Sequence, residues 1–313
     1  MNSVYRTAMT ETTIDEKSEA KALMPTVAWP TLIYLAGLVL VHWGMVWLGM
    51  TGRLPLWSLV LPLGFTSYAH YTLVHESIHG NIIRARGFAW LHTVVGWYGS
   101  LMLSATWPLF ERTHKYHHSF VNTDRDPDIY VKMSFPALLL RNAVSWALQV
   151  LPVLLLRQVF RNRSLTRGYI NADGLMSHAE RVQHHAANIA LVVVMWSLVF
   201  AGFGWQVLFL YYLPVYFATN LLVILFQWLP HHPFRETGRY TATRNTGHSW
   251  LNAAFIWQNW HLMHHLWPGV PFYNYQRLYH RIRPVLEAKG ARHDEGVIPR
   301  AGAIAAPVPQ AAE

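Results

Sequence analysis

Residues 54–79 read LPLWSLVLPLGFTSYAHYTLVHESIH, an apolar run that ends in a pair of histidines. The part from Leu54 to Val74 carries no charge and is long enough to cross the roughly 30 Å hydrocarbon layer of a bilayer as a helix. His75 and His79 follow at a spacing of four residues, which places both imidazoles on one helical face, close enough to bind one metal ion. The stretch therefore predicts a membrane helix that ends in metal ligands.

Three further uncharged apolar runs predict the rest of the membrane domain. Thr26 to Met50 precedes this helix and is joined to it by the short turn Thr51-Gly52-Arg53. Ala186 to Gly202 is joined in the same way to Trp205 to Trp228. Each pair has the length and the tight connection of a transmembrane hairpin. We therefore predict an all-α integral membrane protein with four transmembrane helices in two hairpins.

Two other apolar segments carry more polar side chains than the predicted spans. Residues 88–110 contain His92 and several hydroxyl groups, and residues 135–160 contain Arg141, Asn142 and Gln149. Their lengths would allow them to span, whereas their polarity is typical of helices that lie in the interface or re-enter from one side. We expect both segments to lie on the cytoplasmic leaflet or to dip into it.

The basic residues predict the orientation of the chain in the membrane. If the two hairpins span, only Arg53 of the 25 Lys and Arg lies in the outer connections, which leaves 25 minus 1, or 24, on the side of both termini. The positive-inside rule places that side in the cytoplasm. We therefore expect an inner-membrane protein with a histidine-rich cap and both termini on the cytoplasmic side.

The composition of the 313 residues excludes several classes of protein. Charged residues are 13% of the chain, against roughly 25% in a typical soluble domain. The absence of cysteine excludes disulfides, thiolate zinc sites and iron–sulfur clusters. No nucleic-acid motif accompanies the net charge of +9, so no nucleic-acid partner is expected.

The chain is expected to form one folded domain with two polar or irregular ends. Residues 1–25 are polar and lack the apolar segment of a signal peptide, and they are expected to be a cytoplasmic N-terminus. Residues 26–290 are expected to form a single membrane domain. Residues 291–313 are rich in Ala, Pro and Gly, which is typical of a disordered tail.

The chain has 19 histidines, more than its 16 Asp and Glu together, and nine of them fall into four clusters. Besides His75 and His79, two clusters read H-x-x-H-H, at residues 114–118 and 261–265, and a fourth places Gln227 four residues before His231. All four clusters lie at the same end of their apolar runs, so the four-span topology brings them to one side of the membrane. We predict that they form one metal site, with the following ligands: His75, His79, His114, His117, His118, His231, His261, His264 and His265.

Nine imidazoles exceed the needs of one ion and would supply two ions with about four to six ligands each. Imidazole binds several transition metals, so the ligand type leaves the metal open. The outward-facing N–H group of each ligand needs an orienting acceptor, and carboxylates lie nearby in the sequence. These candidates are Glu76, Glu111, Asp124, Asp126 and Asp128, although the acidic run at 124–128 can also be a solvated turn. The unclustered His70, His92, His248 and His280 are expected to be structural or surface residues.

The first cluster also fits a different enzyme class. His75-Glu76-Ser77-Ile78-His79 matches H-E-x-x-H, in which two histidines bind zinc and the glutamate is the general base of a metalloprotease. An intramembrane zinc protease is therefore an alternative, but it would leave at least six clustered histidines unused. A metal transporter would need ionisable residues within the spans, which contain almost none.

The order H-x-x-x-H, H-x-x-H-H, H-x-x-H-H, with hydrophobic hairpins between the motifs, resembles the membrane fatty-acid desaturase and hydroxylase superfamily from roughly Thr26 to Leu286. WLPHHPF at 228–234, QNWHLMHHLWP at 258–268 and YNYQ at 273–276 resemble its β-carotene hydroxylase branch. The resemblance implies a non-haem di-iron centre held by the nine histidines, O2 as co-substrate, and electrons from a separate protein of the ferredoxin type with its reductase. It also implies that Gln227 lies near an amide position that contacts the metal through water.

The resemblance implies an enzyme that uses O2 to hydroxylate an unactivated C–H bond of a lipid-soluble substrate, with a carotenoid ring as the leading expectation. A fatty-acyl desaturase, or an oxidative decarboxylase that forms an alkene, is the alternative because these reactions begin with the same hydrogen abstraction. Aromatic residues near the clusters are candidates to line the access of this substrate, unless they form an interface belt. They are Trp107, Trp257, Trp260, Trp267, Phe272, Tyr273 and Tyr275.

Overall fold

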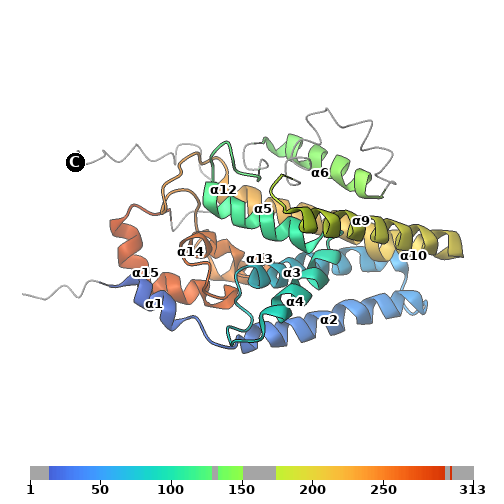
Figure 1. The fold of residues 1–313 in the computed structure, drawn as a ribbon, viewed down its shortest axis with the longest axis horizontal. Helices are drawn as coiled ribbons and strands as arrows, with labels where there is room; N and C mark the ends of the chain where they lie inside the picture. The colour runs from blue at the N-terminus through green and yellow to red at the C-terminus, as the bar shows by residue number, and fades with distance from the viewer. Residues whose placement is uncertain (1–13, 129–132, 151–173, 293–296, 298–313) are drawn as a thin grey trace, which may run out of the picture.

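The computed structural model describes residues 14–128, 133–150, 174–292 and 297, and the regular elements within these ranges are helices (Figure 1). The long helices α2 (Trp29–Met50), α3 (Val60–Ile78) and α9 (His178–Leu198) extend toward one end of the molecule. The short helix α1 (Glu16–Ala22) and the C-terminal helices α14 (His261–Leu266) and α15 (Tyr275–Ala288) gather at the other end.

Two helical stretches are long and apolar enough to cross a membrane. The first is α2, whose 22 residues span about 33 Å at 1.5 Å per residue. The second runs over the 54 residues from His178 to His231, and its most apolar part is not buried inside the protein. Both stretches are consistent with a membrane protein.

The 54-residue stretch reverses direction at the junction predicted from the sequence. Gly202 has a φ of 94°, a left-handed conformation that breaks the helix after α9. The chain then turns back toward the other end of the molecule (Figure 1). The segments at the turn and on the return path are η4 (Val199–Phe203), α10 (Gly204–Val207), η5 (Leu208–Tyr212), α11 (Leu213–Leu221), η6 (Leu222–Trp228) and α12 (Leu229–His231).

The predicted span Leu54–Val74 differs from the structure in its start and in its surroundings. Its first residues form the short helix η1 (Leu56–Leu59), and α3 begins only at Val60. α3 is not among the helices apolar enough to cross a membrane on their own. Most of it is buried between α2, α4 (Ala89–Leu101) and α11, and its polar side chains face protein. The packing is close, since a Cβ at Gly99 of α4 would lie 2.9 Å from the His70 carbonyl oxygen.

Residues 88–110 and 135–160, the two apolar segments with more polar side chains, contain no candidate membrane span among the described residues. Residues 88–110 divide into α4 and the first turn of α5 (Trp107–Phe120), and the 13 residues of α4 cover only about 20 Å. In the second segment, α6 (Phe135–Val150) has 16 residues, and positions 151–160 lie outside the described residues.

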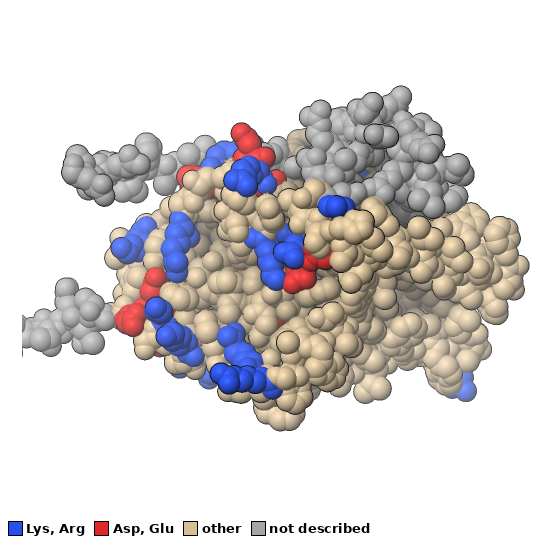
Figure 2. All heavy atoms as spheres, viewed as in Figure 1, with Lys and Arg blue, Asp and Glu red and all other residues tan. Residues whose placement is uncertain are grey.

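The charges gather at the end of the molecule that contains α1 and α15. In Figure 2, groups of Lys and Arg are spread over this end and the middle of the visible face, whereas the described surface of the opposite end shows almost no charge. α1 packs on α15, and its contacts include a hydrogen bond from the Tyr240 hydroxyl to Glu16 (2.8 Å) and an ion pair between Arg281 and Glu19 (3.1 Å). Short helices complete this end: η7 (Ser249–Leu251), α13 (Asn252–Phe255), η8 (Gln258–Trp260) and η9 (Phe272–Asn274).

Candidate metal centre

The structure brings all nine clustered histidines together, from four elements that are far apart in the sequence. His75 and His79 lie at the end of α3, three histidines lie on α5, His231 ends α12, and three lie on α14. Seven pairs of Nε2 atoms lie 2.7–3.3 Å apart. The Nε2 atoms of these histidines therefore point toward one another rather than along a surface.

The nine side chains divide into two groups of four and one shared residue. The first group is His75, His79, His114 and His264, and the second group is His117, His231, His261 and His265. Within each group the ligand atoms lie within 4.8 Å of one another. His118 lies between the groups: its Nε2 is 2.7 Å from Nε2 of His264, and it also forms a set with His265.

The spacing of the nitrogen atoms fits transition-metal binding. Two imidazole nitrogens bound at about 2.1 Å to one ion at a right angle lie about 3.0 Å apart, which matches the observed contacts. A nitrogen-rich set of this kind suits iron, zinc or copper, whereas magnesium and calcium prefer oxygen ligands. The residues present therefore fit two transition-metal ions.

The electrostatics of the site favour neutral imidazoles, the form that binds metal. Burial, together with repulsion between neighbouring imidazoles, holds the pKa of seven of the nine well below the ordinary value. These seven are His79, His114, His118, His231, His261, His264 and His265. Burial also lowers the pKa of His117, but the carboxylates of Asp128 and Asp126 outweigh it and raise this pKa.

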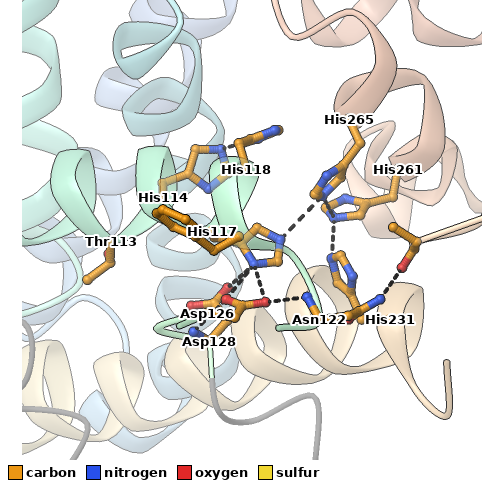
Figure 3. A network of polar contacts seen from close by, with 12 residues as sticks. Thr113, His114, His117, His118, Asn122, Asp126, Asp128, His231, His261 and His265 are labelled. Carbon is orange, nitrogen blue, oxygen red and sulfur yellow. Dashed lines mark hydrogen bonds and ion pairs between the residues drawn. The ribbon is translucent and has the colours of Figure 1, made fainter. Parts of the chain in front are cut away.

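The Nδ1 atoms of three site histidines have orienting partners. Nδ1 of His117 lies 3.0 Å from Oδ1 of Asp126 and 3.6 Å from Oδ2 of Asp128 (Figure 3). Nδ1 of His264 lies 3.2 Å from the Tyr275 hydroxyl. Nδ1 of His75 lies 3.4 Å from Oε1 of Glu76. Such partners fix the ring orientation and leave Nε2 free to bind an ion.

The acidic run at 124–128 acts on the site rather than forming only a solvated turn. After α5 ends, the chain reverses at Asn122, whose φ is 60°. Buried Asp126 then accepts hydrogen bonds from the backbone N–H groups of Asn122 and Asp128, both 2.9 Å, and keeps an oxygen on His117. Burial raises the pKa of Asp128 to about 6.

Two of the carboxylates that were predicted to orient site histidines, Glu111 and Asp124, have other surroundings. Glu111 forms an ion pair with Lys115 (2.6 Å), one turn along α5, rather than with a site histidine. Asp124 is exposed.

Gln227 lies on η6 near His231, and its Oε1 is buried with no hydrogen-bond partner among the described residues.

Most of the predicted aromatic residues pack away from the histidines. The Trp107 ring lies against Gly96 of α4, and Trp260 is a core residue whose Nε1 donates to Asn252 (2.9 Å). The rings of Trp257 and Tyr273 contact Phe272 instead of a site histidine. Trp267 packs under Arg239. Tyr275 does reach the site, but as the hydrogen-bond partner of His264.

Sequence reasoning missed the aromatic residues that do contact the histidines. The ring of Phe226 lies 5.3 Å from that of His75 and 5.2 Å from that of His261. Tyr71 contacts both His75 and Phe226, and Phe110 contacts Tyr71. A signal was present, since Tyr71 and Phe110 stand four residues before His75 and His114.

The geometry of Glu76 disfavours the zinc-protease alternative. Glu76 is fully buried, and its carboxylate lies on the Nδ1 side of His75, where it also accepts a hydrogen bond from the Phe272 backbone N–H (3.4 Å). Nε2 of His75 faces His264 on the opposite side of the ring. A general base must reach water bound at the ion, and Glu76 is directed away from that position.

A comparison with protein families agrees with this geometry. The family model described as fatty acid desaturase matches residues 51–296, a range that contains all nine histidines. No curated protein matches the chain.

Proposed function

The chain belongs to the fatty acid desaturase family, and from this premise we propose that it is a membrane di-iron oxygenase that hydroxylates a carotenoid ring. The family suggests an oxidoreductase, and the histidine clusters of this chain fit a di-iron desaturase or hydroxylase. The observation that carries the proposal is the division of the nine imidazoles into two groups of four, with His118 forming a set with one member of each group. This number of nitrogen ligands is suited to two ions with positions left for O2.

Each part of the site has a defined role in this proposal. The nine histidines hold the two irons, which when bound supply the oxidant needed to remove hydrogen from an unactivated C–H bond. Asp126, Glu76 and Tyr275 orient three of these histidines through Nδ1. The buried ring of Phe226 lies 5.3 Å from that of His75 and would help to exclude water from the position of the reacting carbon.

The carotenoid substrate rests on the resemblance of residues 228–234 and 258–276 to the β-carotene hydroxylase branch. A second candidate is a fatty-acyl desaturase or alkene-forming decarboxylase, which the description of the matching family favours. Both substrates are lipid-soluble, so both fit a protein of the membrane.

We expect expression of the protein in cells that accumulate β-carotene to convert carotene to hydroxylated products, measured by chromatography and mass spectrometry together with the fatty-acid profile. The His264→Ala variant serves as the inactive control. Unchanged carotene with altered fatty acids or new alkenes would replace the leading substrate by the second candidate. No change in either class of lipid would contradict the oxygenase proposal.

We propose that two hairpins cross the membrane, with the metal site and both termini in the cytoplasm, because Arg53 alone lies at the outer connections. The absence of native cysteine allows a direct test by single substitutions. An impermeant maleimide applied to intact cells should label Arg53→Cys but should label Arg86→Cys only after permeabilisation. Both positions are exposed in the structure. The reverse labelling pattern would overturn the orientation.

A separate protein of the ferredoxin type, with its reductase, is proposed as the electron donor. The chain has no cysteine for an iron–sulfur cluster of its own. The end of the molecule next to the histidines carries many Lys and Arg (Figure 2), which would attract an acidic donor. In a purified assay, turnover should therefore depend on an added donor and should fall as the salt concentration rises.

A further inference from the structure

An aromatic residue precedes a site histidine by one helical turn on three separate elements. Tyr71 lies four residues before His75 on α3, and Phe110 lies four residues before His114 on α5. Phe226 lies five residues before His231: it belongs to η6, a π-helical segment with a longer turn, and His231 ends α12. Tyr71 and Phe226 therefore lie on the apolar-run side of their histidines. We call Tyr71, Phe110 and Phe226 the aromatic layer.

The three side chains of the aromatic layer form one continuous contact. The Tyr71 ring lies 5.3 Å from that of Phe110 and 4.8 Å from that of Phe226, and both pairs meet edge to face. Tyr71 and Phe226 are 3% exposed, so this layer is protein interior rather than an interface belt. Tyr71 and Phe226 belong to predicted membrane spans and lie at the ends that lead to the histidines.

Phe226 has a central place in this layer because it contacts both groups of histidines. Its ring lies 5.3 Å from His75 and 6.4 Å from His264 in the first group, and 5.2 Å from His261 in the second group. A carbon atom presented to both metal positions from the membrane side must pass or contact this ring.

The hydroxyl of Tyr71 is the one polar group of the aromatic layer. The residue is 3% exposed, and its hydroxyl is not among the fully enclosed side-chain atoms that lack a hydrogen-bond partner. Its ring lies beside that of His75 (6.4 Å between centroids), so a molecule bound next to this histidine would lie close to the hydroxyl.

We propose that the aromatic layer is the surface against which the lipid substrate rests, and that Phe226 determines which C–H bond faces the metal ions. This inference rests on the proposed oxygenase function but holds for either substrate class. Removing part of the Phe226 ring leaves space in which the chain or ring of the substrate can slide. Different carbon atoms can then reach the same metal position.

The test compares the Phe226→Leu variant with the wild-type protein in the carotene-accumulating cells described above. We expect the ratio of positional isomers among the oxidised products to change by about tenfold or more, the range in which a pocket discriminates one methylene. Iron content and thermal stability of the purified variant are measured in parallel. The positions of oxygen or of new double bonds are determined by mass spectrometry and NMR.

Phe255→Leu is the matched control. Phe255 is 4% exposed, close to the 3% of Phe226, and belongs to a separate apolar cluster with Leu229 and Leu251. It loses the same volume, so it should alter stability without altering the position of oxidation.

An altered isomer ratio in Phe226→Leu alone, with wild-type iron content, supports the proposal. The same ratio in the wild type and both variants overturns it, whatever the change in rate. Should Phe226→Leu not retain iron, the half-buried Phe110→Leu carries the same test with the same two outcomes. If the wild-type protein oxidises neither carotene nor fatty acids, the proposed function fails first, and this result is distinct from an unchanged ratio.

Discussion

His264→Ala and His117→Ala should each reduce turnover by more than about 100-fold, because the loss of an orienting partner alone typically costs roughly 10–100-fold. His264 belongs to the first group, and its Nε2 lies 3.1 Å from that of His75 and 2.7 Å from that of His118. His117 belongs to the second group. The two variants therefore damage different metal positions, and loss of either position should stop the reaction.

Iron analysis separates the two effects. If each variant empties one position, the content should fall from about two irons per chain toward one in both variants, and to about zero in the double variant. His280→Ala is the control, since His280 is exposed and lies beside Trp260 rather than in either group. Full activity in either His264→Ala or His117→Ala would refute the model of one pooled site.

The periodicity of the sequence was sufficient to predict which histidines lie together, because each cluster lies within one or two helical turns. A spacing of three or four residues fixes which side chains share a face whatever surrounds the helix. The apolar runs likewise identified α2 and the stretch that reverses at Gly202. These features depend on local geometry alone.

The features that the sequence did not predict depend on how the chain folds back on itself. Asp126 and Glu111 are both carboxylates near the second cluster, but only Asp126 reaches His117, because the chain reverses at Asn122. Phe226 lies in a π-helical segment, whose turn is longer than that of an α-helix. A search at 3.6 residues per turn therefore does not place Phe226 on the same face as His231.

The surroundings of α3 were also beyond the reach of an apolar-run argument. Length and lack of charge predicted a transmembrane span, whereas α3 is not among the helices apolar enough to cross a membrane on their own and is mostly buried against its neighbours. Thr66 and His70 illustrate the reason, since the His70 ring contacts the Thr66 carbonyl (2.7 Å) and the Tyr98 hydroxyl (3.1 Å). Polar side chains of this kind are accommodated by neighbouring helices, which the sequence of one helix does not reveal.

Removal of the metal ions by a chelator should abolish turnover and lower the thermal stability of the protein. Ions that bind only the folded state stabilise it by about 4 kcal/mol when their free concentration is roughly 1,000 times Kd. For a chain of this size each kcal/mol corresponds to roughly 2–4 °C, so we expect the melting temperature to fall by about 10 °C. Six of the nine imidazoles are buried, and seven pairs of their Nε2 atoms lie 2.7–3.3 Å apart. This dependence should be strong because, without ions, these nitrogens mainly face one another.

Adding back different ions distinguishes occupancy of the site from its chemistry. Ferrous iron should restore both the melting temperature and turnover, whereas zinc, which also binds imidazole but has no redox chemistry, should restore only the melting temperature. The double variant His117→Ala/His264→Ala should show no response of its melting temperature to either ion, which controls for nonspecific binding. Turnover restored by zinc would exclude an oxygenase and would revive a hydrolytic role for His75, Glu76 and His79. Turnover with iron and none with zinc is the result expected of the proposed oxygenase, and it agrees with a Glu76 carboxylate that lies on the Nδ1 side of His75, away from Nε2.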